Sequence, residues 1–323
     1  MSDSTAFPLP SVELRQATAA ALAGQDVITA LPLRVLAVTG SDALTFLQGQ
    51  VTTDMREVSS GESRLGCLLN LKGRIQVSFR TVAVSDGFLL ILPADQMAAT
   101  QARLGKYAVF SKVVLSEREI AVRGVLGSQA RARLQAEGWR WPEAAQLVSR
   151  HHDDSAPDDA LLIRLPGQDR ALLLGGAPEA ANAAVAVAAW HSAVVAAGEL
   201  LLPAAASERY QPQELDYHQL HGVSYQKGCY LGQEIVARLY FRGQLKTALM
   251  RLSAAWPADA GDPALKLGQD IFSGERSVGE VISVTWPDDE RVELLALVRQ
   301  DATELSLDIA GVALALTPLP FSR

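Results

Sequence analysis

Hydrophobic and polar positions alternate most clearly over residues 75–84, where apolar side chains are interleaved with Gln76, Ser78 and Arg80. A period of two residues is typical of a β-strand with one apolar and one polar face. The dipeptide Asp86-Gly87 then predicts a hairpin turn into a second strand. Short apolar runs predict the remaining strands of this part of the chain, over 33–38, 88–92, 120–126, 161–165 and 171–174.

Helical patterns separate these strands. They predict helices over 13–23, 43–49, 95–106, 128–137 and 178–197. From residue 33 onward the order is strand, helix, strand, strand, helix, and the same order recurs once further along the chain. We therefore predict an α+β fold with two similar units in tandem, divided near residues 116–120.

A different pattern begins after Arg242-Gly243. Short apolar strands follow one another without intervening helices, over 245–252, 277–285, 292–299 and 312–316. Strands at this spacing, joined by turns that contain Gly, Pro and Asp, indicate a small antiparallel barrel or sandwich. The predicted organisation is a mobile lead-in over 1–26, an α+β region over 27–242 and a β domain over 243–323.

Composition narrows the class of protein. The chain has 323 residues and a net charge of −7, from 29 basic and 36 acidic side chains, which argues against a broad, non-specific nucleic-acid binder. Its two cysteines are too few for a disulfide framework, so a reducing compartment is expected. No apolar run of suitable composition reaches the roughly 18 residues of a membrane span, and residues 1–14 do not resemble a signal peptide. We therefore expect a cytoplasmic globular protein without a membrane contact.

The segment Lys227-Gly228-Cys229-Tyr230-Leu231-Gly232-Gln233-Glu234 carries the strongest chemical signal. Cys229 lies between two glycines, which let the backbone turn sharply. The basic neighbour Lys227 and a helix predicted to begin at Gln233 would both favour the thiolate over the thiol. The pattern indicates an exposed, activated cysteine. The alternative is a small buried side chain, which is a common position for a free cysteine.

Two further sequence patterns bear on an ion pair in the helix predicted to begin at Gln233 and on metal binding. Glu234 and Arg238 are four residues apart and could form an ion pair on one helix face. A single cysteine cannot hold an iron–sulfur cluster, which normally needs four ligands, but it could supply one ligand transiently or form a mixed disulfide. His218 and His221 are better explained as packed residues than as metal ligands, and the charged segment 151–159 as a solvated loop. No metal site is therefore predicted.

Together with Arg238, the eight-residue segment resembles the signature of the YgfZ family. Three other stretches agree with that family, namely 40–54 (GSDALTFLQGQVTTD), 106–113 (KYAVFSKV) and Gln211-Pro212-Gln213-Glu214 before Gly222. The resemblance covers about residues 33–250. The length of the central motif makes chance agreement remote.

The resemblance implies both a fold and a function. YgfZ proteins are folate-binding-type proteins of iron–sulfur cluster assembly or repair and are also described as tRNA-modifying. They are similar to the T-protein of glycine cleavage, an aminomethyltransferase that uses tetrahydrofolate. This similarity implies two intertwined α+β subdomains and a C-terminal β-barrel around a central hole. It also implies an accessory factor rather than a classical enzyme.

The resemblance assigns roles to residues of the motif loop. It implies that Cys229 is the functional thiol. From residue type and spacing we further expect that Lys227 lowers the pKa of this thiol and that Arg238 orients the loop through Glu234. The other members of the motif loop are Gly228, Tyr230, Gly232 and Gln233.

Folate contacts are implied at other positions. Trp190 corresponds to a tryptophan that the family uses for folate, and Asp54 and Asn70 are further candidates. Tetrahydrofolate or a derivative is therefore the expected cofactor.

Two positions depart from the pattern of folate-binding relatives. Leu33 stands where a second tryptophan is found, and Ala196 stands where T-protein relatives carry a glutamate. A charged hydrogen bond to the pteridine contributes roughly 1.5–3 kcal/mol, so its loss would weaken folate binding. Glu199 or Glu208 could replace the missing carboxylate.

Three hypotheses about function follow. The first is a cytoplasmic, folate-dependent accessory factor for iron–sulfur client enzymes or assembly proteins. The second is a tetrahydrofolate-dependent aminomethyltransferase, which needs a carboxylate near the folate; Asp54 and Asp42 are the candidates, although Asp42 is also explained as a helix N-cap. The third is a non-catalytic module that binds tRNA or a protein. The residues behind the third hypothesis are Arg238, Tyr240, Phe241, Arg242 and Lys246.

Overall fold

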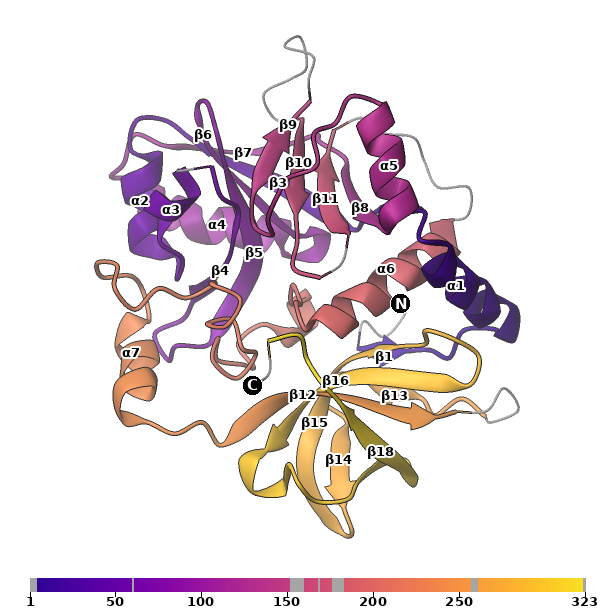
Figure 1. The fold of residues 1–323 in the computed structure, drawn as a ribbon. Helices are drawn as coiled ribbons and strands as arrows, with labels where there is room; N and C mark the ends of the chain where they lie inside the picture. Colours follow the sequence, from indigo (N-terminus) through magenta and orange to yellow (C-terminus); the bar gives the residue numbers. More distant parts are fainter. Residues whose placement is uncertain are drawn as a thin grey trace.

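A computed structural model describes residues 5–59, 61–151, 160–167, 169–175, 183–256 and 261–321 of the chain. These residues form two five-stranded antiparallel sheets beside each other and a closed six-stranded barrel (Figure 1). The predicted α+β fold with a C-terminal barrel is confirmed. Most of the charged segment 151–159 lies outside the described residues, so its prediction as a solvated loop is not tested.

The first sheet comes from the first α+β unit. Its strands, in spatial order, are β4 (Arg64–Leu69), β5 (Ile75–Val84), β6 (Gly87–Pro93), β3 (Leu33–Thr39) and β7 (Val114–Arg118). Its helical segments are α2 (Ala43–Gln50), α3 (Met55–Ser59), η1 (Ala94–Gln96) and α4 (Met97–Ala108). The hydrophobic pattern does not predict α3, but Met55 and Val58 are fully buried in the core of this sheet, and this packing explains the short helix.

The second sheet comes mainly from the second unit. Its strands, in spatial order, are β2 (Val27–Ala30), β8 (Val122–Leu126), β11 (Arg170–Leu174), β10 (Leu161–Arg164) and β9 (Val148–Arg150). Its helices are α5 (Ser128–Ala136) and α6 (Ala183–Ala197). Strand β2 precedes β3 in the chain but pairs with β8, so the two units are intertwined. Apolar side chains such as Val35 and Ile163 pack the two sheets together.

The N-terminal segment, for which a mobile lead-in is predicted, is held on two sides in its described part. Strand β1 (Ala6–Phe7) pairs with β13 (Leu265–Lys266), and helix α1 (Val12–Gly24) packs against α6. Arg15 of α1 is buried and donates a hydrogen bond to the backbone oxygen of Asp289. Local sequence carried no sign of these contacts because most of their partners lie near the other end of the chain.

The C-terminal strands close into a barrel, which decides between the barrel and the sandwich. Its strands, in spatial order, are β12 (Thr247–Ala255), β16 (Arg291–Arg299), β15 (Arg276–Thr285), β14 (Asp270–Ser273), β17 (Leu307–Ile309) and β18 (Val312–Thr317). The short helix η3 (Gln300–Ala302) follows β16. Buried side chains that include Leu252, Val281 and Leu294 form its core. The division into separate domains after residues 26 and 242 stays a prediction.

Both faces of β5 are buried, although its alternation predicts one polar face. The polar face is covered by residues 198–232, which connect α6 to the helix that begins at Gln233. Ser78 accepts a hydrogen bond from the backbone N–H of Leu202 at 2.7 Å. Arg80 forms an ion pair with Glu199 at the start of the connection. The polar residues of β5 therefore pair with the 198–232 connection, which lies much later in the sequence.

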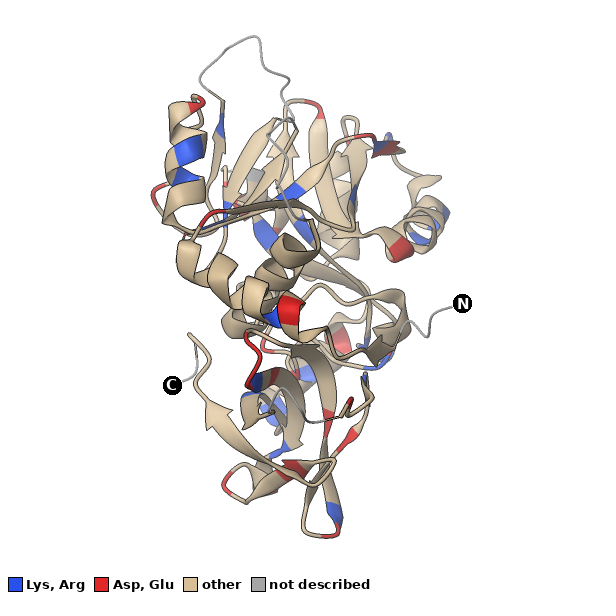
Figure 2. Ribbon diagram, turned by 90° about the vertical axis from the view of Figure 1, so that its right-hand side faces the viewer, with Lys and Arg blue, Asp and Glu red and all other residues tan. Residues whose placement is uncertain are grey.

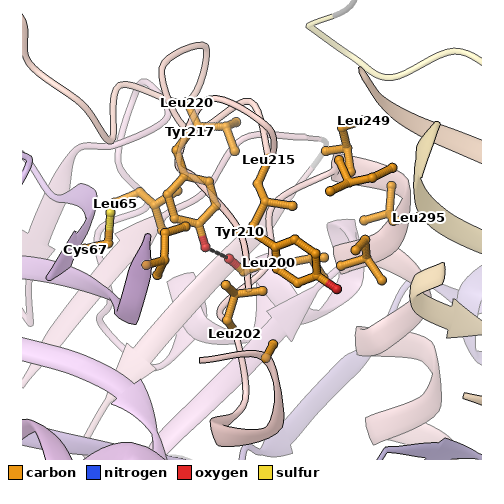
Figure 3. Packing of buried hydrophobic residues seen from close by; sticks show 14 of the residues in the cluster. Leu65, Cys67, Leu200, Leu202, Tyr210, Leu215, Tyr217, Leu220, Leu249 and Leu295 are labelled. Carbon is orange, nitrogen blue, oxygen red and sulfur yellow. Dashed lines mark hydrogen bonds between the residues drawn. The ribbon is translucent and has the colours of Figure 1, made fainter. Parts of the chain in front are cut away.

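The 198–232 connection joins the first sheet to the barrel through one apolar core (Figure 3). The hydroxyl of Tyr217 donates a hydrogen bond to the backbone oxygen of Leu200 at 2.5 Å within this core. Cys67 of β4 and Leu295 of β16 belong to the same cluster. Apart from the short helix η2 (Ala204–Ala206), the connection has no regular secondary structure. Side-chain packing therefore fixes its course.

Lys and Arg residues are interspersed with Asp and Glu residues along the ribbon (Figure 2). This distribution fits the small net charge of −7. Within the described ranges, no helix has the length and apolar character needed to cross a membrane. Local groups of like charge therefore matter more than the overall balance for recognition of a charged partner.

Candidate functional site

Cys229 is exposed on the loop that leads into helix α7 (Gln233–Arg242), drawn in orange in Figure 1. Gly232 precedes the helix with a φ of 81°, and a Cβ atom there would lie 2.7 Å from the backbone oxygen of Asn70. Backbone conformation and space therefore both require glycine at this position. A Cβ atom at Gly228 would meet no atom within 4 Å, so sterics do not require the first glycine.

The ammonium group of Lys227 is turned into the protein, and this corrects the expected role of the residue. Its Nζ donates hydrogen bonds to the backbone oxygens of Val51, at 2.7 Å, and Thr53, at 2.6 Å. It also lies 5.1 Å from the centre of the Tyr230 ring. Only 4% of Lys227 is exposed, so its charge serves the base of the loop rather than the exposed thiol.

Further hydrogen bonds tie the loop to the same segment. The backbone N–H of Ser224 donates to the backbone oxygen of Thr52 at 2.9 Å. The hydroxyl of Thr52 donates to the backbone oxygen of Gly222 at 2.6 Å. The stretch 51–53 therefore acts as a fixed support for residues 222–227, and Cys229 lies two residues beyond the last anchor.

Glutamine side chains hold the other end of the loop. The side chain of Gln233 accepts a hydrogen bond from the backbone N–H of Tyr230 at 3.3 Å. Gln213 donates from its side chain to the backbone oxygen of Val236 in α7 at 2.8 Å. These contacts give a structural reason for the motif glutamine and for the 211–214 stretch.

Glu234 and Arg238 both lie exposed on α7, and no ion pair joins them in the described part of the chain. The expectation that Arg238 orients the loop through Glu234 therefore finds no support. Exposed ion pairs of this kind contribute about 0.3–0.5 kcal/mol, so hydration of both groups competes with pairing.

Replacing Lys227 by methionine tests the anchoring role. Two buried backbone oxygens would lose their donor, so we expect a loss of about 1–3 kcal/mol in the free energy of unfolding. Burial lowers the pKa of Lys227 to about 7, with Asp54 opposing the shift and Arg56 adding to it. Between this value and the ordinary 10.5, the unfolded chain binds more protons than the folded one. The wild type should therefore gain stability over Lys227→Met as the pH rises from 6 to 9.

Urea unfolding of both proteins at pH 6 and pH 9 measures this difference. Lys72→Met, at an exposed lysine, is the matched control and should change neither the stability nor its pH dependence. A stability difference that stays flat or shrinks toward pH 9 would show that Lys227 is not a buried anchor.

A second feature is a cavity of about 240 Å³ beside α6. The Trp190 side chain lines it together with apolar residues that include Leu33, Leu172 and Leu201. Trp190 also belongs to the core between the two sheets, and a Cβ atom at Gly124 would lie 2.5 Å from its ring. The tryptophan is thus both a packed residue and part of the cavity wall.

The polar part of the cavity wall is an ion cluster of Glu199, Arg80 and Arg170. The Glu199 carboxylate pairs with Arg80 through one oxygen and with Arg170 through the other, the latter at 2.8 Å. The guanidinium of Arg170 also lies 5.8 Å from the centre of the Trp190 ring. Burial alone would raise the pKa of Glu199, but the two arginines outweigh it and hold the pKa below its usual value. Two guanidinium groups and one carboxylate leave the cluster with an excess positive charge.

The other candidate folate residues do not line this cavity. The Asp54 carboxylate accepts hydrogen bonds from Arg56, which hold its pKa well below the usual range, and from Gln48. The Asn70 side chain accepts hydrogen bonds from two backbone N–H groups of the β4–β5 turn. Asp42 makes no N-cap hydrogen bond to α2 and instead accepts one from the backbone N–H of Lys112.

Of the two carboxylates proposed as replacements, Glu199 lies in the cavity wall. Glu208 lines a separate hollow together with Asn70. Sequence reasoning missed Arg80 and Arg170 as parts of this site. The signal was a charged residue within a predicted strand or at its edge, since an arginine there is buried only if it is paired.

Metal-binding groups do not gather in the described residues: no three His, Cys, Asp or Glu side chains are placed to hold an ion. Cys67 is fully buried, and burial raises the pKa of its thiol to about 12. Thr52 lies within hydrogen-bond distance of its sulfur, at 3.4 Å. Cys67 is therefore a core residue, and Cys229 is the exposed thiol.

The fold places the chain in the aminomethyltransferase T class of structures. The crystal structure of glycine cleavage system aminomethyltransferase T from Bartonella henselae superposes on 98% of this chain and 91% of its own, with a TM-score of 0.68 and 18% sequence identity. At this identity the likeness concerns the fold alone.

The chain belongs to the YgfZ family. It is 32% identical to the tRNA-modifying protein YgfZ of Escherichia coli, over 95% of this chain and 97% of that protein. It is also 32% identical to the YgfZ protein of Yersinia pseudotuberculosis, over 89% and 90% of the two chains. The corresponding value for Vibrio vulnificus is 29%, over 90% of both chains. No protein-family model matches the chain.

Proposed function

We propose that this protein is a cytoplasmic, folate-binding accessory factor in the assembly or repair of iron–sulfur clusters, with an effect on tRNA modification. The observation that carries the proposal is the exposed Cys229 on a loop anchored at both ends. The relatives' name as tRNA-modifying proteins supports the connection to tRNA.

The anchored thiol suits work on a partner's cluster. A cluster normally needs four protein ligands, and one cysteine supplies one. Lys227 and Thr52 fix the base of the loop. A partner can therefore reach the Cys229 thiol without the loop first having to become ordered. Such a thiol can coordinate one iron of a cluster whose other ligands come from the client or assembly protein.

The residues of the cavity fit the pteridine part of a folate. Its volume of about 240 Å³ lies below the roughly 300–1,000 Å³ typical of drug-sized ligands, so it suits a flat ring system with the tail outside. Trp190 and the leucines offer apolar contact, and the Glu199 carboxylate retains lone pairs for N–H donors of a pteridine. Bound folate would supply one-carbon chemistry, and Glu199 would supply the carboxylate that T-protein relatives carry at the position of Ala196.

Replacing Trp190 by phenylalanine tests the cofactor. Loss of the larger indole surface should weaken tetrahydrofolate binding about two- to tenfold, measured by calorimetric titration. Trp256→Phe, at a tryptophan equally buried in the barrel, is the matched control and should leave the affinity unchanged. Melting temperatures of both variants report any loss of folding.

Two outcomes would contradict a folate site at this position. One is a titration of the wild type without heat of binding at millimolar tetrahydrofolate. The other is an equal loss of affinity in Trp190→Phe and Trp256→Phe, since this would trace the effect to general destabilisation.

A further inference from the structure

Three aromatic side chains form a cluster on the surface beside the Cys229 loop. The rings of Tyr225 and Tyr240 are stacked, with centroids 3.8 Å apart and planes 16° from parallel. Phe241 meets both rings edge to face, at 5.0 Å from Tyr240 and 6.5 Å from Tyr225. Tyr240 is 54% exposed and Phe241 is 68% exposed. We call Tyr225, Tyr240 and Phe241 the aromatic platform.

The platform and the thiol belong to one structural unit. Tyr225 precedes Cys229 by four residues on the anchored loop, and it packs against the central core. Tyr240 and Phe241 lie in the last turn of α7, which begins four residues after the thiol. Because the half-buried Tyr225 holds the ring of Tyr240 in a stack, the exposed rings are ordered before any partner arrives.

Three cationic side chains flank Tyr240 and Phe241 of the platform along the chain. Arg238, Phe241 and Arg242 follow the i, i+3, i+4 spacing, so they share one face of α7. Lys246 follows in the exposed stretch between α7 and the barrel. Among the described residues none of the three cations forms an ion pair, although most arginines of this acidic chain do. The acidic residue of the helix, Glu234, lies in its first turn, away from the platform.

Rings interleaved with unpaired cations are the chemistry of single-stranded nucleic-acid binding. Bases stack on exposed aromatic faces, while arginine and lysine contact the backbone phosphates. A duplex keeps its bases stacked on each other and cannot use such rings. Protein interfaces also favour Tyr, Phe and Arg, but their cores are depleted in charge and in lysine. The three unpaired cations beside the rings therefore favour a nucleic-acid partner.

We propose that the aromatic platform binds unpaired bases of tRNA and places the RNA next to Cys229. The inference deepens the proposed function by naming a partner, and it rests on that function only for the choice of tRNA among RNAs. Phe241 and Tyr240 provide the stacking surface, while Arg238, Arg242 and Lys246 hold the phosphates.

Fluorescence anisotropy with a labelled tRNA stem-loop that has an unpaired loop tests this proposal. Phe241→Ala should weaken binding about 5- to 100-fold, the range for loss of one base–aromatic stack. Phe110→Ala, at a phenylalanine that is 93% exposed on another loop, is the matched control and should bind like the wild type. The plot of log affinity against log salt should have a slope near −2 for three phosphate contacts, and Arg242→Gln should reduce it by about 0.7.

Equal binding by wild type and Phe241→Ala would overturn the proposal, as would equal losses in Phe241→Ala and Phe110→Ala. If the wild type binds no stem-loop while Phe241→Ala still impairs iron–sulfur enzymes in cells, the platform binds a protein and the RNA proposal fails. The assay contains neither folate nor a cluster enzyme, so its failure is distinct from failure of the proposed function.

Discussion

Replacing Cys229 by serine should abolish the protein's support of iron–sulfur enzymes in a bacterial strain that lacks its own YgfZ protein. The sulfur is exposed and lies between the anchored ends of the loop, so the change removes chemistry without removing packing. Exposed substitutions of this kind change stability by no more than about 0.5 kcal/mol. The melting temperature should therefore stay within about 2 °C of the wild type. Enzyme activity in cell extracts and thermal unfolding of the purified variant measure the two effects.

The second cysteine provides the matched control. Cys67 is fully buried in the core between the first sheet and the connection, so Cys67→Ala should lower stability by about 1 kcal/mol and keep function. The two variants should thus show opposite patterns. Full support of iron–sulfur enzymes by Cys229→Ser would remove the thiol from the mechanism, whatever the folate result.

Replacing Glu199 by glutamine should cause the largest loss of stability, about 3–5 kcal/mol. The carboxylate is the shared partner of two arginines, and 1–2% of each arginine is exposed. Without it the two buried guanidinium groups would have no counter-ion in this cluster, although Arg80 keeps Ser63 and Gln146 as acceptors. Urea unfolding at pH 7 measures the loss, and tetrahydrofolate titration of the same variant reports whether the cavity still binds.

The pH dependence identifies the charge as the cause. Because the pKa of Glu199 is lowered in the folded state, its contribution is present above the ordinary value of 4.5 and is lost as the pH falls below it. The gap between wild type and Glu199→Gln should therefore narrow at acidic pH. Glu117→Gln removes an exposed pair with Arg34 and should cost less than about 1 kcal/mol. A similar small loss for Glu199→Gln would mean that the buried cluster contributes no more than a surface pair.

Local sequence patterns predicted the elements whose buried side chains recur at a regular spacing within one stretch of the chain. The strand over 75–84, the hairpin after it and the C-terminal strands follow from periodicity and turn residues. Helix α3 and several strands, among them β1, β2, β4, β7 and β14, escaped prediction. They are short or show no period of two, and pairing or packing with other segments stabilises them. The same limit explains why the N-terminal helix was expected to be mobile.

The two parts of the candidate site also differ in how far the sequence predicted them. The motif around Cys229 is contiguous, so its sequence predicted an exposed loop before a helix. The cavity is assembled from Arg80, Arg170, Trp190 and Glu199, which come from two sheets, a helix and a connection. The family resemblance pointed to the tryptophan and offered the glutamate as one of two alternatives. It assigned no partner to either arginine.

The amino-acid sequence by itself determined the family, the change from an α+β region to a run of C-terminal strands, and the segment around Cys229 as the candidate for an exposed thiol. These properties depend on neighbouring residues, whose spacing is set by the backbone. Only the tertiary structure decided that Lys227 supports the loop from inside, that Glu199 pairs with two buried arginines, and that Tyr225 stacks on Tyr240. Each of these contacts joins positions far apart in the chain or on different elements. Their energies depend on burial and distance, which exist only once the chain has folded.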